Sequence, residues 1–187
     1  MKILLVTGPP YSGKGTQCEI LEKELRFKHI STGERIRSEK KLKTDIGKTM
    51  SEYEEKGDLV PDSIMKDLLG KIIDENSNEK GIILDGYPRT ESQVDTLIEL
   101  LNEKDQKIDK VINIELAKEE LLIRAKKRAE DSDRSDDKDS QTHIKRIEVF
   151  ESSNRPAIEY MKTQFDVISI DGLGNIDKIT KEIKFNL

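Results

Sequence analysis

The sequence predicts an α/β protein in which helices cover both faces of one parallel sheet. Five short apolar runs are typical of strands, and segments with helical periodicity separate them. A glycine-rich loop follows the first run and leads into a helix. Strands that alternate with helices require crossover connections, so we expect a three-layer domain. Its ligand should lie beyond the carboxyl ends of the strands.

The expected strands are residues 2–8, 28–32, 81–86, 110–116 and 166–171. Three of these runs are nearly continuous in apolar residues, as in strands buried on both faces. Apolar positions three, four and seven apart predict amphipathic helices between the strands, as at Val94, Leu97, Ile98 and Leu101. The helix after the glycine-rich loop has the same period, and we expect its Cys18 to be a buried apolar contact.

Two stretches interrupt the alternation of strands and helices. Residues 31–74 contain helical segments and no apparent strand, and Asp62 after Pro61 is a plausible N-cap within them. Residues 129–139 are acidic and almost free of apolar side chains. We expect both stretches to be insertions at the open edge of a single domain that spans residues 1–187.

Composition and charge narrow the possible functions. The net charge of −5 gives no reason to expect a nucleic-acid partner. One cysteine excludes an internal disulfide framework and a cysteine-based zinc site. His29 and His143 match no metal-ligand spacing. No segment reads as a signal peptide or a membrane span, so we expect a cytoplasmic protein with no membrane partner.

The loop "GPPYSGKGTQ" (8–17) is typical of a phosphate-binding loop. Gly8, Gly13 and Lys14 match the pattern G-x-x-x-x-G-K between a strand and a helix. Backbone N–H groups and the helix N-terminus would then face an anion. Thr16 and Asp85 are the candidates to hold Mg²⁺, largely through water. The alternatives are a turn without a ligand and an N-cap role for Asp85, although Thr90 is the better-placed cap.

A series of motifs resembles those of the adenylate kinases, a family of nucleoside monophosphate kinases. The motifs are the loop at 8–17, "STGERIR" (31–37), "GDLVPD" (57–62), "LDGYPRTESQ" (84–93), "RAKKR" (124–128), "RSDD…R" (134–146) and "IDGLGNI" (170–176). The resemblance covers the whole chain. It implies the P-loop kinase fold with a five-stranded parallel sheet in the order 2-3-1-4-5. It also implies a monophosphate-binding insertion (31–74), a short lid (129–139), and reversible, Mg²⁺-dependent transfer between ATP and AMP by a monomer, giving two ADP.

The resemblance also implies roles for individual residues. Arg124 would pack on the donor adenine, which the backbone of Gly174 would meet. The ATP site as a whole would comprise Tyr11, Ser12, Gly13, Lys14, Gly15, Thr16, Arg124, Arg128 and Gly174. The AMP site would comprise Thr32, Arg37, Asp58, Leu59, Val60, Gly86, Tyr87, Pro88, Arg89, Gln93, Arg134 and Arg146. The residues expected to act in catalysis are Lys14, Arg89, Arg128, Arg134 and Arg146.

Acceptor choice depends on two of these residues. Related kinases for UMP and CMP typically carry Ala where Thr32 stands, and an amide such as that of Gln93 can pair with an adenine edge. Both residues have the identity found in kinases that act on AMP, so we expect AMP as the acceptor. A kinase for UMP or CMP is the alternative. The short lid has no cysteine, and no zinc site is expected there.

Tyr11 is the main departure from the family pattern, which usually has Gly at this position. A non-glycine residue in a sparsely allowed backbone region costs about 1–3 kcal/mol. The ring could point outward with activity intact, or the phenol could lie near the donor site and tune binding or lid closure. The loop could also be disabled, which would leave a non-catalytic nucleotide-binding regulator. We expect the first outcome, with the side chain turned away from the phosphates.

Overall fold

The computed structural model describes residues 1–42, 44–56, 58–131 and 140–187. A single sheet lies at its centre, formed by β1 (Lys2–Thr7), β2 (Lys28–Ser31), β3 (Gly81–Asp85), β4 (Lys110–Glu115) and β5 (Val167–Asp171). The strand order is β2-β3-β1-β4-β5, and every pairing is parallel. The five predicted strands and their order are therefore confirmed.

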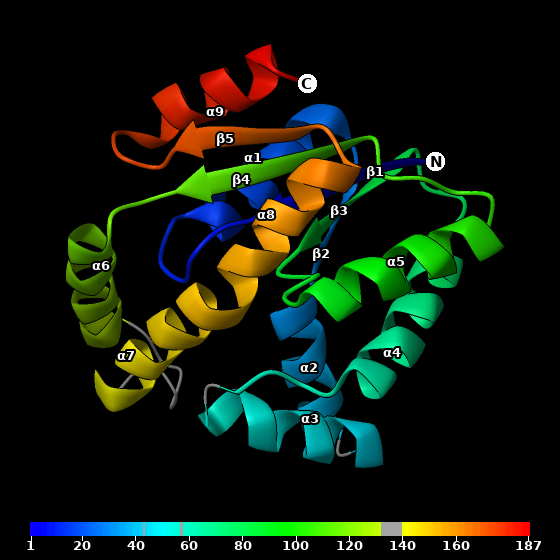
Figure 1. Ribbon diagram of the computed structural model, residues 1–187, viewed down its shortest axis with the longest axis horizontal. Helices are drawn as coiled ribbons and strands as arrows, with labels where there is room; N and C mark the ends of the chain where they lie inside the picture. Colours follow the sequence, from blue (N-terminus) through cyan, green and yellow to red (C-terminus); the bar gives the residue numbers. More distant parts are fainter. Residues whose placement is uncertain (43, 57, 132–139) are drawn as a thin grey trace.

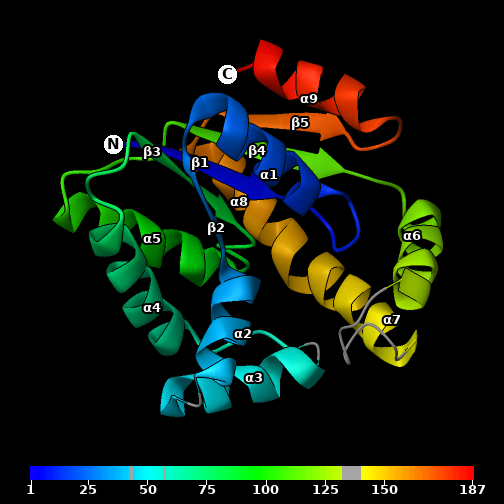
Figure 2. The ribbon, with the colours of Figure 1, turned by 180° about the vertical axis from the view of Figure 1, so that it is seen from behind.

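Helices cover both faces of the sheet (Figure 1, Figure 2). One face carries α1 (Lys14–Leu25) and α9 (Ile176–Phe185), and the other carries α4 (Asp62–Glu75), α5 (Glu91–Glu103) and α8 (Arg155–Gln164). Ile3 and Leu5 of β1 belong to the α4–α5–α8 side of the core, whereas Leu4 and Val6 belong to the α1–α9 side. Since successive side chains of a strand point to opposite faces, burial on both faces explains the nearly continuous apolar runs.

Two helical groups flank the carboxyl ends of the strands (Figure 1). The first consists of α2 (Thr32–Lys41) and α3 (Asp45–Lys56), which continue into α4 without an intervening strand in the described part of residues 31–74. The second consists of α6 (Lys118–Asp131) and α7 (Ser140–Val149). A π-helical segment, η2 (Phe150–Asn154), joins α7 to α8. Residues 132–139 of the expected lid, Arg134 among them, lie outside the described residues.

The helix starts test two expectations from the sequence. Thr90 caps α5 as expected, because its hydroxyl accepts a hydrogen bond from the Gln93 backbone N–H at 3.1 Å. The expected N-cap role of Asp62 is wrong: Pro61 holds the N-cap position of α4, with φ −54° and ψ 143°. Asp62 is the first helical residue, and its carboxylate accepts from the Gln93 side chain at 2.7 Å. Among the helices described, none is both long and apolar enough to cross a membrane.

Candidate active site

The loop after β1 wraps closely against the neighbouring strand. Gly8 has φ 140°, and a Cβ atom there would lie 2.3 Å from the Ile114 carbonyl oxygen of β4. Only glycine fits this approach, since the obstacle is a backbone atom that cannot turn away. The loop then ends at Lys14, the first residue of α1. The strand, the loop, the lysine and the helix thus have the order that phosphate binding at a helix N-terminus requires.

The carboxyl ends of the strands border a cleft of about 460 Å³. The loop forms its floor, the residues around α2 and β3 form one wall, and α6, α7 and η2 form the other. The expected site residues that line this cleft are Tyr11, Gly13, Lys14, Gly15, Thr16, Thr32, Arg37, Asp58, Leu59, Val60, Asp85, Gly86, Tyr87, Pro88, Arg89, Gln93, Arg128 and Arg146. The cleft therefore collects residues from six of the motifs noted in the sequence.

Cations from both walls converge on Lys14. Its ammonium group donates a hydrogen bond to the Pro9 carbonyl oxygen at 3.3 Å. Burial lowers the pKa of Lys14, the nearby Asp85 carboxylate raises it, and the charges of Arg89 and Arg128 lower it further. Arg89 and Arg128 belong to opposite walls, so three positive charges act on the same space above the loop. An anion placed there would relieve their mutual repulsion.

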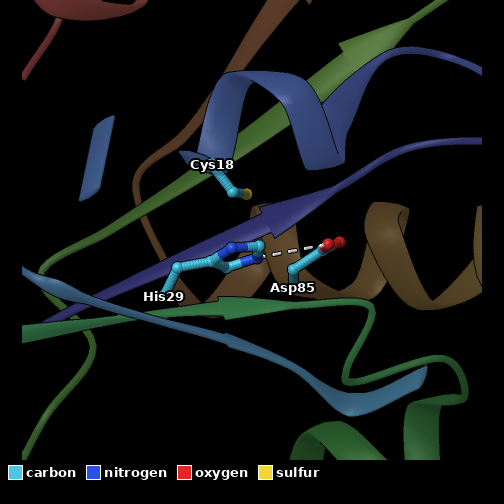
Figure 3. Close-up of side chains that lie close together, drawn as sticks. All are labelled: Cys18, His29 and Asp85. Carbon is cyan, nitrogen blue, oxygen red and sulfur yellow. Dashed lines mark ion pairs between the residues drawn. The ribbon is translucent and has the colours of Figure 1, made fainter. Parts of the chain in front are cut away.

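His29 of β2 and Asp85 at the end of β3 form a buried pair (Figure 3). The His29 Nε2 and the Asp85 Oδ2 are 3.5 Å apart, which is long for a hydrogen bond. Burial opposes the charged forms of both groups. Nevertheless, the interaction with His29 and the charge of Lys14 hold the pKa of Asp85 below its usual value, and Asp85 raises the pKa of His29. Asp85 is therefore ionised and oriented at the edge of the cleft.

Cys18 completes a small cluster with this pair. One ligand atom each from Cys18, His29 and Asp85 lies within 4.8 Å of the other two, an arrangement that could hold a metal ion. His29 matches no metal-ligand spacing in the sequence, and it meets these residues because β2 pairs with β3. The expectation that the histidines hold no metal stays a prediction. Two features oppose a bound cation here. Burial and Asp85 raise the pKa of the Cys18 thiol, and the positive Lys14 faces Asp85. Cys18 is fully buried, as predicted.

The expected acceptor residues form a hydrogen-bonded group beside β3. The Thr32 hydroxyl lies 3.1 Å from the Asp85 carbonyl oxygen and 3.2 Å from that of Gly86, to which it can donate. The Gln93 amide oxygen accepts from the Arg89 backbone N–H at 2.8 Å, and the Arg89 Nε donates to the Gly86 carbonyl oxygen at 2.6 Å. These contacts fix both Gln93 and Arg89. The Gln93 amide nitrogen donates one hydrogen to Asp62 and carries a second that a ligand can use.

Arg124 does not line the cleft, and its contacts hold the phosphate-binding loop in place. Its guanidinium donates to the Ser12 carbonyl oxygen at 3.4 Å and to that of Gly172 at 3.0 Å, and it pairs with Glu120 at 2.8 Å. Arg124 therefore ties the loop to the connection between β5 and α9. Ser12 and Gly174 are also outside the set of lining residues. Contact of Arg124 and Gly174 with a donor adenine stays a prediction.

Tyr11 does not point outward into solvent as we expected. Only 8% of it is exposed, and it packs against apolar residues of α6 and α7. Its hydroxyl group is hydrogen-bonded to the Nδ1 of His143, 2.5 Å away. The ring is therefore not turned outward, because these helices cover the loop at this point. Intact activity, with the side chain turned away from the phosphates, stays a prediction. The arrangement favours the second interpretation, in which the phenol acts near the donor site.

Sequence reasoning missed several residues that line the cleft or contact its lining. His29 pairs with Asp85, and His143 pairs with Tyr11. Lys145 of α7 forms an ion pair with Asp58 at 2.8 Å and so joins the two walls of the cleft. Phe150 and Asn154 line the cleft from η2, and π-helical turns are frequent at functional sites. Only the helical register of α7 could have indicated the positions of Lys145 and His143.

The fold and the site together define a class of protein. A glycine-rich loop lies between β1 and α1, its lysine is surrounded by arginines from both walls, and an ionised carboxylate lies at the end of the adjacent strand. Phosphoryl transfer requires positioning and charge neutralisation, which this arrangement supplies. The site is therefore that of a phosphotransferase of the P-loop class.

Comparisons with known proteins give the family. The family model for adenylate kinase matches residues 6–165. The chain is 38% identical to an adenylate kinase of Bacteroides thetaiotaomicron over 180 residues, which cover 96% of this chain and 95% of the relative. Identity is 37% with one from Porphyromonas gingivalis, covering 96% and 92% of the two chains, and 34% with one from Flavobacterium psychrophilum, covering 96% and 95%. The chain belongs to the adenylate kinase family, which confirms the expected fold and enzyme class, an ATP:AMP phosphotransferase.

Proposed function

We propose that the cleft binds the donor ATP phosphates over Lys14 and the acceptor AMP against Thr32 and Gln93. The observation that carries this proposal is that Lys14 lines one cleft together with Arg89 and Arg128, which belong to opposite walls. A donor on the loop and an acceptor beside β3 would place their phosphates between those walls. The AMP phosphate would then be held by Arg37 and Arg89. The phosphoryl group in transfer would be held by Arg128 and Arg146. The role of Arg134 in this last group rests on the family motif alone.

The chemistry needs no covalent intermediate on the protein. An oxygen of the AMP phosphate attacks the γ-phosphorus of ATP, and the bond from that phosphorus to the β–γ bridging oxygen breaks in line. Both products are ADP, and the step is reversible. Negative charge develops on the oxygens of the transferred phosphoryl group and on the leaving oxygen. Lys14 and the nearby arginines stabilise that charge. Closure of the walls over both nucleotides would expel water, which would otherwise accept the phosphoryl group.

Asp85 and Thr16 fit a hydrated Mg²⁺ that arrives with ATP. The Asp85 Oδ1 is buried and has no hydrogen-bond partner among the described residues, as expected of an atom that accepts from an ion's water shell. Asp85 is ionised, and Thr16 lines the same cleft. When bound, the ion would neutralise charge on the β- and γ-phosphates. The chain's own contribution is to hold Asp85 in place through His29 and Lys14.

AMP is the proposed acceptor because Thr32 and Gln93 are both fixed at the end of the cleft. No observation favours UMP, CMP or a purely regulatory role. A monomer located in the cytoplasm stays our expectation from the sequence.

The test measures initial ADP formation from Mg·ATP with AMP, UMP, CMP and GMP as acceptors. We expect rapid turnover with AMP and little with the others. Lys14→Ala should lower kcat by about 100-fold or more, because it removes a charge on the transferred group. Lys23→Ala is the matched control, since Lys23 is exposed on the same helix. Faster turnover with a pyrimidine monophosphate would contradict the AMP assignment, and full activity of Lys14→Ala would contradict the site.

A further inference from the structure

The side chain of Tyr11 is the part of the cleft that the proposed reaction leaves unexplained. Tyr11 has φ 68°, in the left-handed region that glycine enters without strain and tyrosine does not. Its ring is buried against Leu121 and Ala125 of α6 and Ile147 of α7. A strained backbone persists where surrounding contacts compensate for it, and here both helices supply such contacts.

The polar end of Tyr11 lies against His143 in a buried environment. The two groups are joined by the hydrogen bond between the hydroxyl and Nδ1, and their rings meet edge to face, with centroids 5.2 Å apart. His143 is only 5% exposed. A buried hydroxyl and a buried imidazole both need partners, and each provides one for the other.

Two arginines of the cleft contact the same tyrosine. The Arg146 guanidinium donates to the Tyr11 hydroxyl at 3.5 Å. The Arg128 guanidinium lies 5.8 Å from the centre of the Tyr11 ring, within the range of a cation–π interaction. Arg128 and Arg146 both line the cleft, as does Tyr11 itself. One side chain of the loop thus meets the two arginines that line the cleft from the described parts of α6 and α7.

We propose that Tyr11 and His143 are a pair of positioning residues that hold Arg128 and Arg146 over the donor phosphates. The His143 Nδ1 accepts a hydrogen bond from the Tyr11 hydroxyl. This hydrogen bond directs the lone pairs of the hydroxyl oxygen toward Arg146. The Tyr11 ring holds the Arg128 guanidinium through the cation–π interaction. His143 acts only through Tyr11, and neither residue touches the reacting atoms. This inference rests on the proposed function, because it assumes that the two arginines act on the phosphoryl group in transfer.

The first set of variants removes parts of the pair. Tyr11→Phe keeps the ring and removes the hydroxyl. His143→Leu removes the acceptor, whereas His143→Asn keeps a side-chain oxygen close to the position of Nδ1. Tyr11→Gly removes the whole side chain and suits the observed φ, so it introduces no backbone strain. Tyr160→Phe is the matched control, because it removes a tyrosine hydroxyl that bonds Asp95 at 2.7 Å on the exposed surface.

The expected result is a fall in kcat with little change in KM for ATP. Arginines that act mainly in the transition state affect kcat rather than ground-state binding. Tyr11→Phe and His143→Leu should each lower kcat by about tenfold, and the double variant by about as much as either one, because both break one interaction. His143→Asn should retain most of the wild-type kcat, Tyr11→Gly should lose more than Tyr11→Phe, and Tyr160→Phe should match the wild type.

A second measurement follows the pair directly. The chain has two histidines, so the imidazole ¹⁵N signals of His29 and His143 can be assigned from single variants. Tyr11→Phe should shift the Nδ1 signal of His143 and leave that of His29 in place. This readout needs no turnover, and it remains informative if a His143 variant folds poorly.

The outcomes separate this inference from the proposed function. If wild-type protein converts ATP and AMP to ADP, but Tyr11→Phe and His143→Leu keep full kcat or reduce it independently of each other, the pair does not position the arginines. An unchanged His143 Nδ1 signal in Tyr11→Phe would also contradict the hydrogen bond between Tyr11 and His143. Lack of turnover in the wild type would instead reject the proposed function, and the ¹⁵N result would still decide whether the pair exists.

Discussion

Gly86 offers a sharp test of the acceptor site, because an added methyl group would reach two of its side chains. Gly86 has φ 83°, and a Cβ atom there would lie 3.1 Å from both the Arg89 Nη2 and the Thr32 Oγ1. Such contacts are tighter than ordinary van der Waals packing, so both groups must move by a few tenths of an ångström. The substitution Gly86→Ala therefore perturbs two parts of the proposed AMP site: Thr32, which would contact the base, and Arg89, which would hold the phosphate.

The magnitude has two parts. Placing alanine in the left-handed region costs about 1–2 kcal/mol of folding free energy. For a chain of this size, each kcal/mol shifts Tm by about 2–4 °C, so Tm should fall by about 2–8 °C. Displacing Arg89 weakens a charge-assisted hydrogen bond worth about 1.5–3 kcal/mol when intact. A loss of about half of that, about 0.75–1.5 kcal/mol, predicts a fall of about 4- to 13-fold in kcat/KM for AMP.

The assay compares KM for AMP at saturating ATP with KM for ATP at saturating AMP, alongside thermal unfolding. We expect the change in KM for AMP and not for ATP. Gly70→Ala is the control: Gly70 lies inside α4, its Cβ would meet the Leu100 Cδ1 at an ordinary 3.8 Å, and it should stabilise the protein without changing either KM. A Gly86→Ala enzyme with unchanged KM for AMP, or with the change in KM for ATP instead, would refute the assignment of Thr32 and Arg89.

Three further predictions concern stability and reactivity. Thr90→Ala removes the α5 N-cap and should lower the free energy of unfolding by about 1 kcal/mol in urea titrations. An unchanged free energy of unfolding would mean that the capping hydrogen bond of 3.1 Å does not contribute to stability. Burial raises the pKa of Asp109, but its hydrogen bonds from Lys2 and the Ile3 N–H outweigh burial and hold that pKa below its usual value. The unfolded state therefore binds more protons than the folded state as the pH falls through the usual range of an aspartate. Wild-type stability should fall there, and that of Asp109→Asn should fall less; parallel curves would contradict this linkage. Burial and Asp85 raise the pKa of Cys18, so iodoacetamide should leave the folded protein unmodified and react once in urea, and rapid alkylation of the native protein would show that the thiol is exposed.

The sequence by itself determined the sheet, the phosphate loop and the family. Nearly continuous apolar runs are a local signal of strands buried on both faces, and the loop pattern between Gly8 and Lys14 is contiguous in the chain. The cap at Thr90 was equally readable, because capping depends on residues three positions apart. Each of these features arises from neighbours along the chain, so no knowledge of the packing was needed.

Only the tertiary structure decided which distant side chains meet. Tyr11 and His143 are 132 positions apart, and nothing in the sequence indicated that they meet. His29 joins Asp85 because β2 pairs with β3, and Arg124 braces the loop through carbonyl oxygens of Ser12 and Gly172. Backbone carbonyl groups are present at every position and carry no sequence signal. The partners of a histidine, an arginine or a tyrosine therefore depend on how helices and strands pack, because that packing alone brings such groups within bonding distance.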